Sequence, residues 1–302
     1  MRQVLLISND RAGSVSTAAR EVIVKALAAD FKLDVAHTTR RDHASDLAEE
    51  GVDRGFDAVV VFGGDGTVNE AAQPLVATDV AFGILPGGTT NVMAKILGIP
   101  RDPIEATAFL AQRLRERIVR RIGVGRVNAR YFLFSAGMGL DAEVVKRVEA
   151  DPAGKRSRPE WTYLKNALRA GTTEYRGKDT KITLELDGHD PARLLFCVCA
   201  NARPLTFFKG RPVDALPDAD LETRLDFFGL DRVTLATVPR IAWSVFVSRS
   251  HPGWKHGHYF RDIASASWRA VEPMPVQVDG DYIGDWDRAV IRHVADALDV
   301  VA

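Results

Sequence analysis

Short apolar runs alternate with amphipathic segments along the first third of the chain. The apolar runs predict buried strands at residues 3–8, 32–38, 56–63 and 80–86. The intervening patterns predict helices at about Ser16–Ala29, at about His43–Gly51, from near Val68 onward, and around Asn91–Leu97. This alternation is typical of a doubly wound parallel sheet in a Rossmann-like, three-layer α/β domain. The loops after the strands then lie beyond the strands' carboxyl ends, where open α/β sheets bind ligands.

The pattern changes after about residue 115. Residues 117–139, 181–202 and 222–230 read as strands joined by turns, and one helix is expected at about Pro159–Ala170. We therefore predict an α/β domain over residues 1–115 and a mostly antiparallel β-sandwich domain over residues 116–302. The last residues could return to the first domain.

The composition limits the choice of partner. The 302 residues carry a formal net charge of zero, so no overall field favours nucleic acid or an anionic membrane. The segment "RLRERIVRR" is locally basic and could face a membrane, but arginines on the wet face of a strand explain it with fewer assumptions.

The cellular location is predicted from thiols and from apolar runs. Cys197 and Cys199 are the only cysteines, and side chains two apart on a strand point to opposite faces and do not easily bridge. Reduced thiols fit a reducing compartment. The apolar run near the start is too short for a signal peptide, and none is long enough to span a membrane. We expect a cytoplasmic protein without a transmembrane segment.

Residues 59–72, "VVVFGGDGTVNEAA", place an acid inside a glycine-rich loop that follows a strand. Glycines at positions 63, 64 and 66 let the backbone approach a ligand closely. An acid there would repel phosphate, unless a cation such as Mg²⁺ lies between Asp65 and the phosphate oxygens. Thr67 could donate a hydroxyl hydrogen bond at the helix N-terminus. The alternative is a tight glycine turn whose aspartate caps the next helix.

Several motifs together carry a family resemblance. "GGDGTVNEA" followed by "GILPGGTTNVMAKILGIP" closely resembles the catalytic domain of soluble diacylglycerol and sphingoid lipid kinases. "FLFSAGMGLDAEVV" and "VQVDGDYIG" extend the match to about residue 284. The GGDGT motif alone is shared with NAD kinases and phosphofructokinases, whereas the combination is more specific. The resemblance implies an active site in the cleft between two domains.

The resemblance implies a nucleotide site built from the loops after the first four strands. Its ATP-binding positions are Asn9, Gly13, Thr38, Gly63, Gly64, Asp65, Gly66, Thr67, Asn69, Glu70, Gly88, Thr89 and Asn91. Two departures stand out: Asp10 replaces a proline of the family's first loop, and Val92 replaces an acid that often follows Asn91.

The late acidic motif of the family implies a general base. Here it reads "DGD", with Asp279 leading and Asp281 in place of the family's glutamate. Both are expected catalytic residues together with Asp65, and Asp281 would accept the proton of the lipid hydroxyl. The same residues predict a type I′ hairpin with Asp-Gly at its centre. The two interpretations are compatible, because a hairpin tip can present a carboxylate.

The metal ligands implied by the resemblance are Asp65 and Glu222. Asp65 would lie near the Mg²⁺ that accompanies ATP. Glu222 and Thr223 stand where the family often has Asp-Gly at a second, structural Mg²⁺ site. The missing glycine weighs against that second ion.

The resemblance as a whole implies an ATP- and Mg²⁺-dependent lipid kinase. It would transfer the γ-phosphoryl group to a hydroxyl of diacylglycerol or a related lipid at the membrane surface, with peripheral attachment possible. An NAD kinase-like phosphotransferase and a catalytically silent nucleotide- or lipid-binding protein are the alternatives. No nucleic-acid partner is expected. The oligomeric state is open, and a homodimer is compatible with the sequence.

Overall fold

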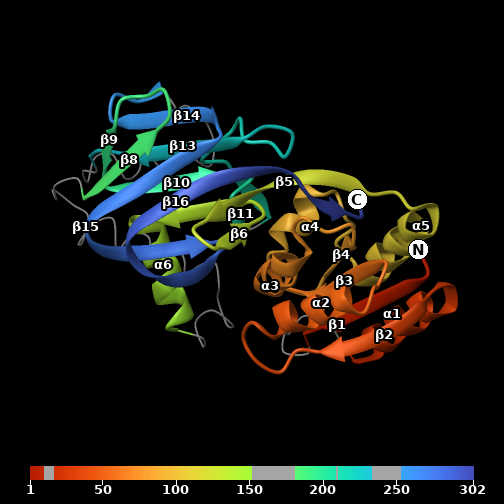
Figure 1. Cartoon of the computed structure of the whole chain (residues 1–302). Coiled ribbons are helices and arrows are strands. Elements are labelled where there is room, and N and C mark those ends of the chain that lie inside the picture. The colour runs from red at the N-terminus through yellow and green to blue at the C-terminus, as the bar shows by residue number, and fades with distance from the viewer. Residues whose placement is uncertain (10–16, 152–180, 209, 233–252) are drawn as a thin grey trace. The chain divides into compact units, whose positions relative to one another are not determined.

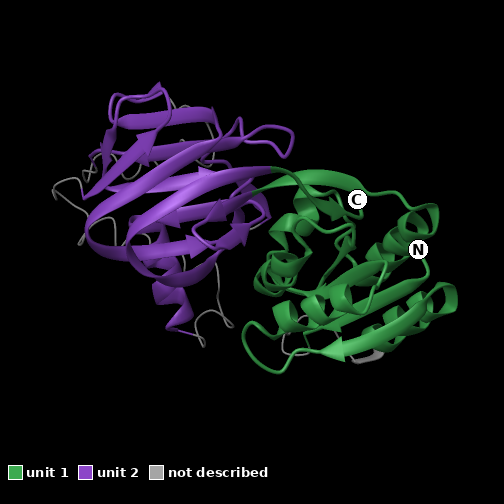
Figure 2. Ribbon diagram, viewed as in Figure 1, with its two compact units in different colours: residues 1–124, 295–302 green, residues 125–294 purple. Residues whose placement is uncertain are grey.

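The computed structural model describes residues 1–9, 17–151, 181–208, 210–232 and 253–302 (Figure 1). The chain forms two compact units (Figure 2): unit 1 contains Met1–Val124 and Ala295–Ala302, and unit 2 contains Gly125–Val294. The division predicted from the sequence falls at residue 115. Asp10, Gly13 and the helix predicted at 159–170 lie outside the described residues.

Unit 1 contains a parallel sheet with strand order β4-β3-β1-β2. Its strands are β1 (Gln3–Ser8), β2 (Lys32–His37), β3 (Ala58–Gly63) and β4 (Ala81–Pro86). Every residue of β3 and β4 is buried, as expected for parallel strands with both faces covered. The covering helices are α1 (Thr17–Asp30), which packs beside α5 (Pro103–Glu116), and α2 (His43–Asp53), which packs beside α3 (Asp65–Leu75).

The α3 helix begins earlier than the sequence analysis predicted. Val68 was the expected start, but its N–H donates to the carbonyl oxygen of Gly64 at 3.0 Å, which makes Gly64 the N-cap. Asp65 is therefore the first helical residue. The last three residues of GGDGT form a helical turn, so the motif is only partly a loop.

The helix α5 is not among the predicted elements, and the basic pattern of its last residues had favoured a strand instead. Asp102 accepts hydrogen bonds from the N–H groups of Ile104 and Glu105 at 2.9 and 3.0 Å, and Pro103 occupies the first turn. Aspartate at the N-cap with proline at the first helical position is a strong start signal. The short helix α4 (Val92–Ile96) lies where it was predicted.

Unit 2 is mostly antiparallel, as predicted, and its strands belong to one branched sheet and one separate hairpin. The main path is β14-β13-β10-β7-β15-β16. These strands are β7 (Ser135–Met138), β10 (Phe196–Ala200), β13 (Leu225–Leu230), β14 (Gly257–Ile263), β15 (Ser265–Val278) and β16 (Asp281–Val300). The branches are β5 (Arg120–Val127), β6 (Arg130–Phe132), β8 (Ile182–Leu186) and β9 (Ala192–Leu194), and the separate hairpin is β11 (Thr206–Phe208) with β12 (Arg211–Val213).

The long strand β15 lets the sheet of unit 2 branch. Its first half pairs with β8 through Ala266–Ala270, and its last residues pair with β7 through Val276–Val278. An irregularity between Arg269 and Met274 separates the two pairings. The helix α6 (Leu140–Glu149) packs against β15, β7 and β10.

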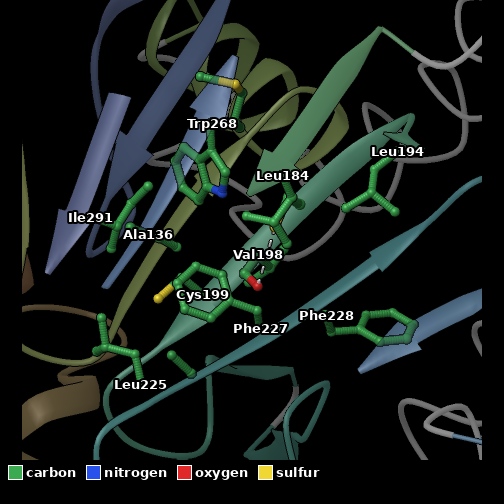
Figure 3. Close-up of a cluster of buried hydrophobic side chains, with 14 of the residues drawn as sticks. Ala136, Leu184, Leu194, Val198, Cys199, Leu225, Phe227, Phe228, Trp268 and Ile291 are labelled. Carbon is green, nitrogen blue, oxygen red and sulfur yellow. Dashed lines mark hydrogen bonds between the residues drawn. The ribbon is translucent and has the colours of Figure 1, made fainter. Parts of the chain in front are cut away.

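The core of unit 2 gathers side chains from several of these strands (Figure 3). Trp268 from β15 and Phe227 from β13 are fully buried, and Cys199 from β10 lies among them. Cys197 and Cys199 are both free thiols, and burial raises the pKa of each well above its usual range. These cysteines therefore serve as small apolar core residues.

The end of β16 belongs to unit 1. Val300 pairs in parallel with Phe82 of β4, and the N–H of Val301 donates to the Phe82 carbonyl at 2.9 Å. The N–H of Ala77 donates to the carbonyl of Ala297 at 2.7 Å. The C-terminal residues thus add a strand to the edge of β4.

Candidate active site

Four chain segments meet at the carboxyl edge of the parallel sheet in unit 1. They begin at Asn9 after β1, Thr38 after β2, Gly64 after β3 and Gly87 after β4. The amide nitrogen of the Asn9 side chain donates to the Thr67 hydroxyl oxygen at 2.8 Å. The first segment is thereby tied to the first turn of α3.

The two glycine-rich motifs pack backbone against backbone. The N–H of Gly87 donates to the carbonyl of Gly63 at 2.9 Å. A Cβ atom at Gly88 would lie 2.6 Å from the Cα of Gly64, and one at Gly63 would lie 2.8 Å from the Cβ of Thr67. Contacts this short leave no room for a side chain. Gly88 is therefore needed for the approach of the two motifs to each other, and Gly63 for the tight turn within GGDGT, independently of any ligand.

Asp65 links the same two motifs through its carboxylate. Its Oδ1 accepts hydrogen bonds from the N–H groups of Val92 at 2.6 Å and Met93 at 3.3 Å, at the start of α4. The alternative considered from the sequence, an aspartate that caps the next helix, is wrong for α3, because Gly64 is its N-cap and the Asp65 side chain instead bonds the first N–H groups of α4. Burial and the charge of Arg101 lower the pKa of Lys95, whereas the Asp65 carboxylate acts to raise it.

The second glycine loop is closed by its own asparagine. The Asn91 side chain accepts from the N–H of Gly88 at 2.8 Å and donates to the Gly88 carbonyl at 2.7 Å. Asn91 has a left-handed backbone, with φ of 49°, which asparagine adopts more readily than most residues. Thr89 at the tip of the loop is exposed. Its hydroxyl is therefore accessible.

Asn69 and Glu70 take part in the scaffold beneath this edge. Asn69 is fully buried, and the side-chain amide of Gln73 donates to its carbonyl oxygen at 2.9 Å. The Glu70 carboxylate accepts from the N–H of Ala44 at 3.3 Å, in the first turn of α2. Thr38 is half-buried, and its N–H donates to the Ser8 carbonyl at 3.0 Å. These contacts fix the frame around the two glycine-rich motifs.

In unit 2 the DGD motif forms the tip of the hairpin between β15 and β16. Val278 pairs with Asp281, which leaves a two-residue loop, and Asp279 and Gly280 have φ of 49° and 82°. Two positive φ angles are those of a type I′ turn. The hairpin expected from the sequence is present, and Asp281 is the half-buried first residue of β16.

Asp279 is buried and anchors this hairpin tip. One carboxylate oxygen accepts from the N–H of Leu133 at 2.7 Å, and the other accepts from Phe134 at 2.9 Å and Ser135 at 3.0 Å. The Asp279 side chain is only 3% exposed. Both of its carboxylate oxygens therefore accept hydrogen bonds from backbone N–H groups. Asp281 is the more accessible acid of the motif.

Three residues around Asp281 were not identified from the sequence. The Gln277 side chain accepts from the N–H of Gly280 at 2.9 Å and donates to Asp141 at 2.7 Å. The Glu149 carboxylate accepts from the N–H of Tyr282 at 2.9 Å. Burial raises the pKa of Asp141, and the bond from Gln277 partly offsets that shift. Asp141 and Gln277 lay within motifs already noted, "GMGLDAEVV" and "VQVDGDYIG", whereas Glu149 lay in neither.

The segment around Glu222 does not fit a second structural ion. Glu222 is exposed, and its N–H donates to the Asp220 carboxylate at 3.0 Å. The nearby Arg224 forms a two-pronged ion pair with Asp262, at 3.0 and 2.8 Å. A guanidinium there opposes a cation electrostatically. Throughout the described ranges, no three His, Cys, Asp or Glu side chains are grouped as metal ligands.

Among the described residues, no helix combines the length and the apolar character needed to cross a membrane.

Comparison with known proteins gives consistent matches. Residues 3–127 match the family described as the diacylglycerol kinase catalytic domain. A diacylglycerol kinase from Bacillus subtilis (strain 168) is 29% identical over 280 residues, which covers 89% of this chain and 88% of that protein. A protein from Pseudomonas aeruginosa named "Probable lipid kinase YegS-like" is 32% identical over 150 residues, 49% of this chain and 47% of its own length.

A solved structure extends the fold comparison to both units. The crystal structure of a diacylglycerol kinase from Bacillus anthracis strain Sterne matches with a TM-score of 0.76 at 22% identity. The match covers 99% of this chain and 96% of that one. At that identity the match shows a shared fold.

Proposed function

We propose that this chain is a lipid kinase of the family that carries the diacylglycerol kinase catalytic domain, and that it transfers the γ-phosphoryl group of ATP to a hydroxyl of diacylglycerol or a related lipid. The observation that carries the proposal is the packing of GGDGT against PGGTTN at the carboxyl edge of a parallel sheet. Ligands of open α/β sheets bind at that edge.

The first turn of α3 suits the phosphates of ATP. The first N–H groups of a helix lack partners within the helix, and its N-terminus carries partial positive charge. Glycines at positions 63 and 64 add no side chain next to this turn. The Thr67 hydroxyl, held by Asn9, and the exposed Thr89 hydroxyl are additional groups for phosphate oxygens.

The donor set at Asp65 fits a Mg²⁺ ion that arrives with ATP. Asp65 offers a carboxylate beside the first turn of α3, and carboxylate oxygen is a ligand type that Mg²⁺ prefers. Mg²⁺ commonly uses one or two carboxylates together with phosphate oxygens and water. When bound, the ion supplies charge neutralisation for the transferring phosphoryl group.

We assign the proton transfer to Asp281 and an anchoring role to Asp279. As the lipid oxygen bonds to the γ-phosphorus, the bond from that phosphorus to the bridging oxygen of ADP breaks. The proton of the lipid hydroxyl passes to the Asp281 carboxylate. Asp279, with both oxygens on backbone N–H groups, supports the turn that presents Asp281.

The test is transfer of label from γ-labelled ATP in the presence of Mg²⁺. Mixed micelles would contain diacylglycerol, monoacylglycerol, a sphingoid base, ceramide or a polyprenol, with NAD and buffer alone as separate acceptors. We expect a labelled lipid that disappears when EDTA removes Mg²⁺. Labelled NADP would replace the proposal with an NAD kinase-like activity. ATP binding without transfer to any acceptor would favour the silent binding protein.

Two neutral variants separate chemistry from folding. Asp65→Asn keeps an acceptor oxygen for the α4 amides but removes the charge, and Asp281→Asn removes the base with little change in size. We expect each to lower kcat by at least about 100-fold, because a general base and a metal-linked carboxylate each contribute on that scale. Near-normal turnover in either variant would contradict the role assigned to that residue.

A further inference from the structure

We infer that both ends of helix α6 hold the tip of the β15–β16 hairpin. In this inference Gln277 and Glu149 are positioning residues for Asp281. The inference rests on the proposed function only in calling Asp281 the base. The contacts that support it are independent of that assignment, and all of them lie within unit 2.

Two peptide groups close to Asp281, those joining residues 279–280 and 281–282, are each held by a side chain. On one side, the N–H of Gly280 donates to the amide oxygen of Gln277 at 2.9 Å. On the other side, the N–H of Tyr282 donates to Glu149 at 2.9 Å. The 280–281 peptide lies between these two held planes, so the backbone angles available to Gly280 and Asp281 are restricted. The direction of the Asp281 carboxylate is thereby restricted as well.

Asp141 determines how the Gln277 amide faces. A glutamine amide has an oxygen that accepts and a nitrogen that donates, and rotating it by half a turn exchanges the two. The Gln277 nitrogen donates to Asp141 at 2.7 Å, so its oxygen faces the N–H of Gly280. In the reverse orientation, the NH₂ group would face the N–H of Gly280 and two donors would oppose each other. Asp141 thus selects the Gln277 amide orientation in which the oxygen accepts the hydrogen bond from the turn.

Asp141 and Glu149 come from opposite ends of one rigid element. Asp141 lies in the first turn of α6, and Glu149 is its last residue. Eight residues of helix separate them by about 12 Å along the axis. The helix is itself seated by buried Ala142 and Val148. Because the two points of attachment are this far apart on the helix, they fix the angle of the hairpin tip relative to α6 as well as its position.

The kinetic test uses pairs of variants that differ only in hydrogen-bond capacity. Glu149→Ala and Gln277→Leu each remove one point of attachment, whereas Glu149→Gln and Asp141→Asn each keep an oxygen that can accept the same bond. Glu143→Ala is the matched control, because Glu143 lies on the same helix and pairs with Arg147 at 2.7 Å. Turnover of the lipid that the wild type phosphorylates is measured for each variant.

We expect Glu149→Ala and Gln277→Leu to lower kcat by about 10- to 100-fold, since a misplacement of about 1 Å costs on that order. The KM for ATP should stay within about twofold, because the nucleotide loops lie in unit 1. Glu149→Gln, Asp141→Asn and Glu143→Ala should remain within about threefold of wild type. Equal losses in Glu149→Gln and Glu149→Ala would overturn the inference, since charge and not position would then be at work.

Hydrogen exchange of residues 277–284 separates this inference from the proposed function. Exchange at the amides of Gly280 and Tyr282 should accelerate at least about tenfold in Gln277→Leu and Glu149→Ala respectively, and not in Glu143→Ala. Unchanged exchange in both would overturn the inference even if the lipid is phosphorylated. If the wild type transfers no phosphate but the variants show the expected acceleration of exchange, the proposed function is refuted. The contacts by which α6 holds the hairpin tip would still be established.

Discussion

At the scale of residues, the space around a single Cβ atom determines whether a glycine can be replaced. Gly88 would place a Cβ atom 2.6 Å from the Cα of Gly64, and that neighbour is backbone, which cannot rotate away. Gly55 has a positive φ of 72° but nothing within 4 Å of a Cβ. The sequence alone shows glycine at both positions and does not distinguish the two reasons for it. The structure separates a packing requirement at Gly88 from a conformational one at Gly55.

A Gly88→Ala substitution should therefore push the two glycine-rich motifs apart. We expect ATP affinity to fall at least about tenfold and the free energy of unfolding to fall by about 1–3 kcal/mol, as overpacking typically costs. Calorimetric ATP titration and urea unfolding measure the two effects. Gly55→Asn is the control, because asparagine accepts a left-handed backbone and should change the unfolding free energy by less than about 1 kcal/mol. Normal ATP binding in Gly88→Ala would contradict the packing argument.

Asp279→Ala should destabilise unit 2 strongly. Three backbone N–H groups, those of residues 133–135, would lose a charged acceptor in a buried place. We expect the free energy of unfolding to fall by about 3 kcal/mol or more, because each unsatisfied buried donor costs about 1–3 kcal/mol. Urea unfolding measures the change.

Asp285→Ala is the comparison for that experiment. The Asp285 carboxylate pairs with the Lys146 ammonium group, and its side chain is 39% exposed. Exposed ion pairs contribute about 0–1 kcal/mol, so a loss below 1 kcal/mol is expected. Similar losses in the Asp279 and Asp285 variants would show that burial does not determine the value of these carboxylates.

At the scale of elements, an ion pair links the edge strand β14 to the segment that leads into β13. Arg224 at the end of the segment before β13 pairs with Asp262 on β14, and the bonds from Arg224 lower the pKa of Asp262 to about 2. An unfolded aspartate has a pKa near 3.9. Because the folded pKa is the lower one, the pair stabilises the fold above about pH 4. That contribution disappears as the pH falls toward 2.

The difference in unfolding free energy between wild type and Arg224→Ala should therefore shrink as the pH is lowered from about 5 to about 2.5. Denaturant unfolding across that range measures it, and added salt should reduce the difference at every pH because the pair is exposed. In an Asp262→Asn background, Arg224→Ala should show no such pH dependence. A dependence that persists there would assign the effect to another carboxylate.

At the scale of the whole molecule, unit 1 includes residues from both ends of the chain. Ala297, Leu298, Val300 and Val301 are buried in it, and Val300 adds to the β4 edge. The chain leaves unit 1 along β5 and comes back along β16. Unit 1 is therefore complete only when both strands are present.

Deleting residues 295–302 should destabilise unit 1 by about 5 kcal/mol or more, since each large apolar side chain that is fully buried contributes about 1.5–3 kcal/mol. Hydrogen exchange of β4 is the measurement, and its protection should be lost. Deleting only Ala302, which is half-buried, should leave that protection unchanged. Retained protection after the longer deletion would show that unit 1 is stable without the returning strand.

The sequence by itself determined the fold class, because its evidence is local. The apolar runs that predict β1, β3 and β4 match the observed bounds within about two residues, since buried parallel strands need continuous apolar stretches. The Asp-Gly pair likewise predicted the hairpin at 279–280. Helix α5 was also readable in principle, from its Asp-Pro start, but the basic residues at its end were taken for a strand.

Only the tertiary structure decided what the acids of these motifs contact. Asp65 bonds residues 92 and 93, Asp279 bonds residues 133–135, and Glu149 bonds residue 282. These partners are far away along the chain, and no local pattern encodes a hydrogen bond between distant segments. The nucleotide-binding and proton-transfer roles remain predictions. Residue types and local periodicity specify the elements, whereas the partners of buried polar groups depend on how those elements pack.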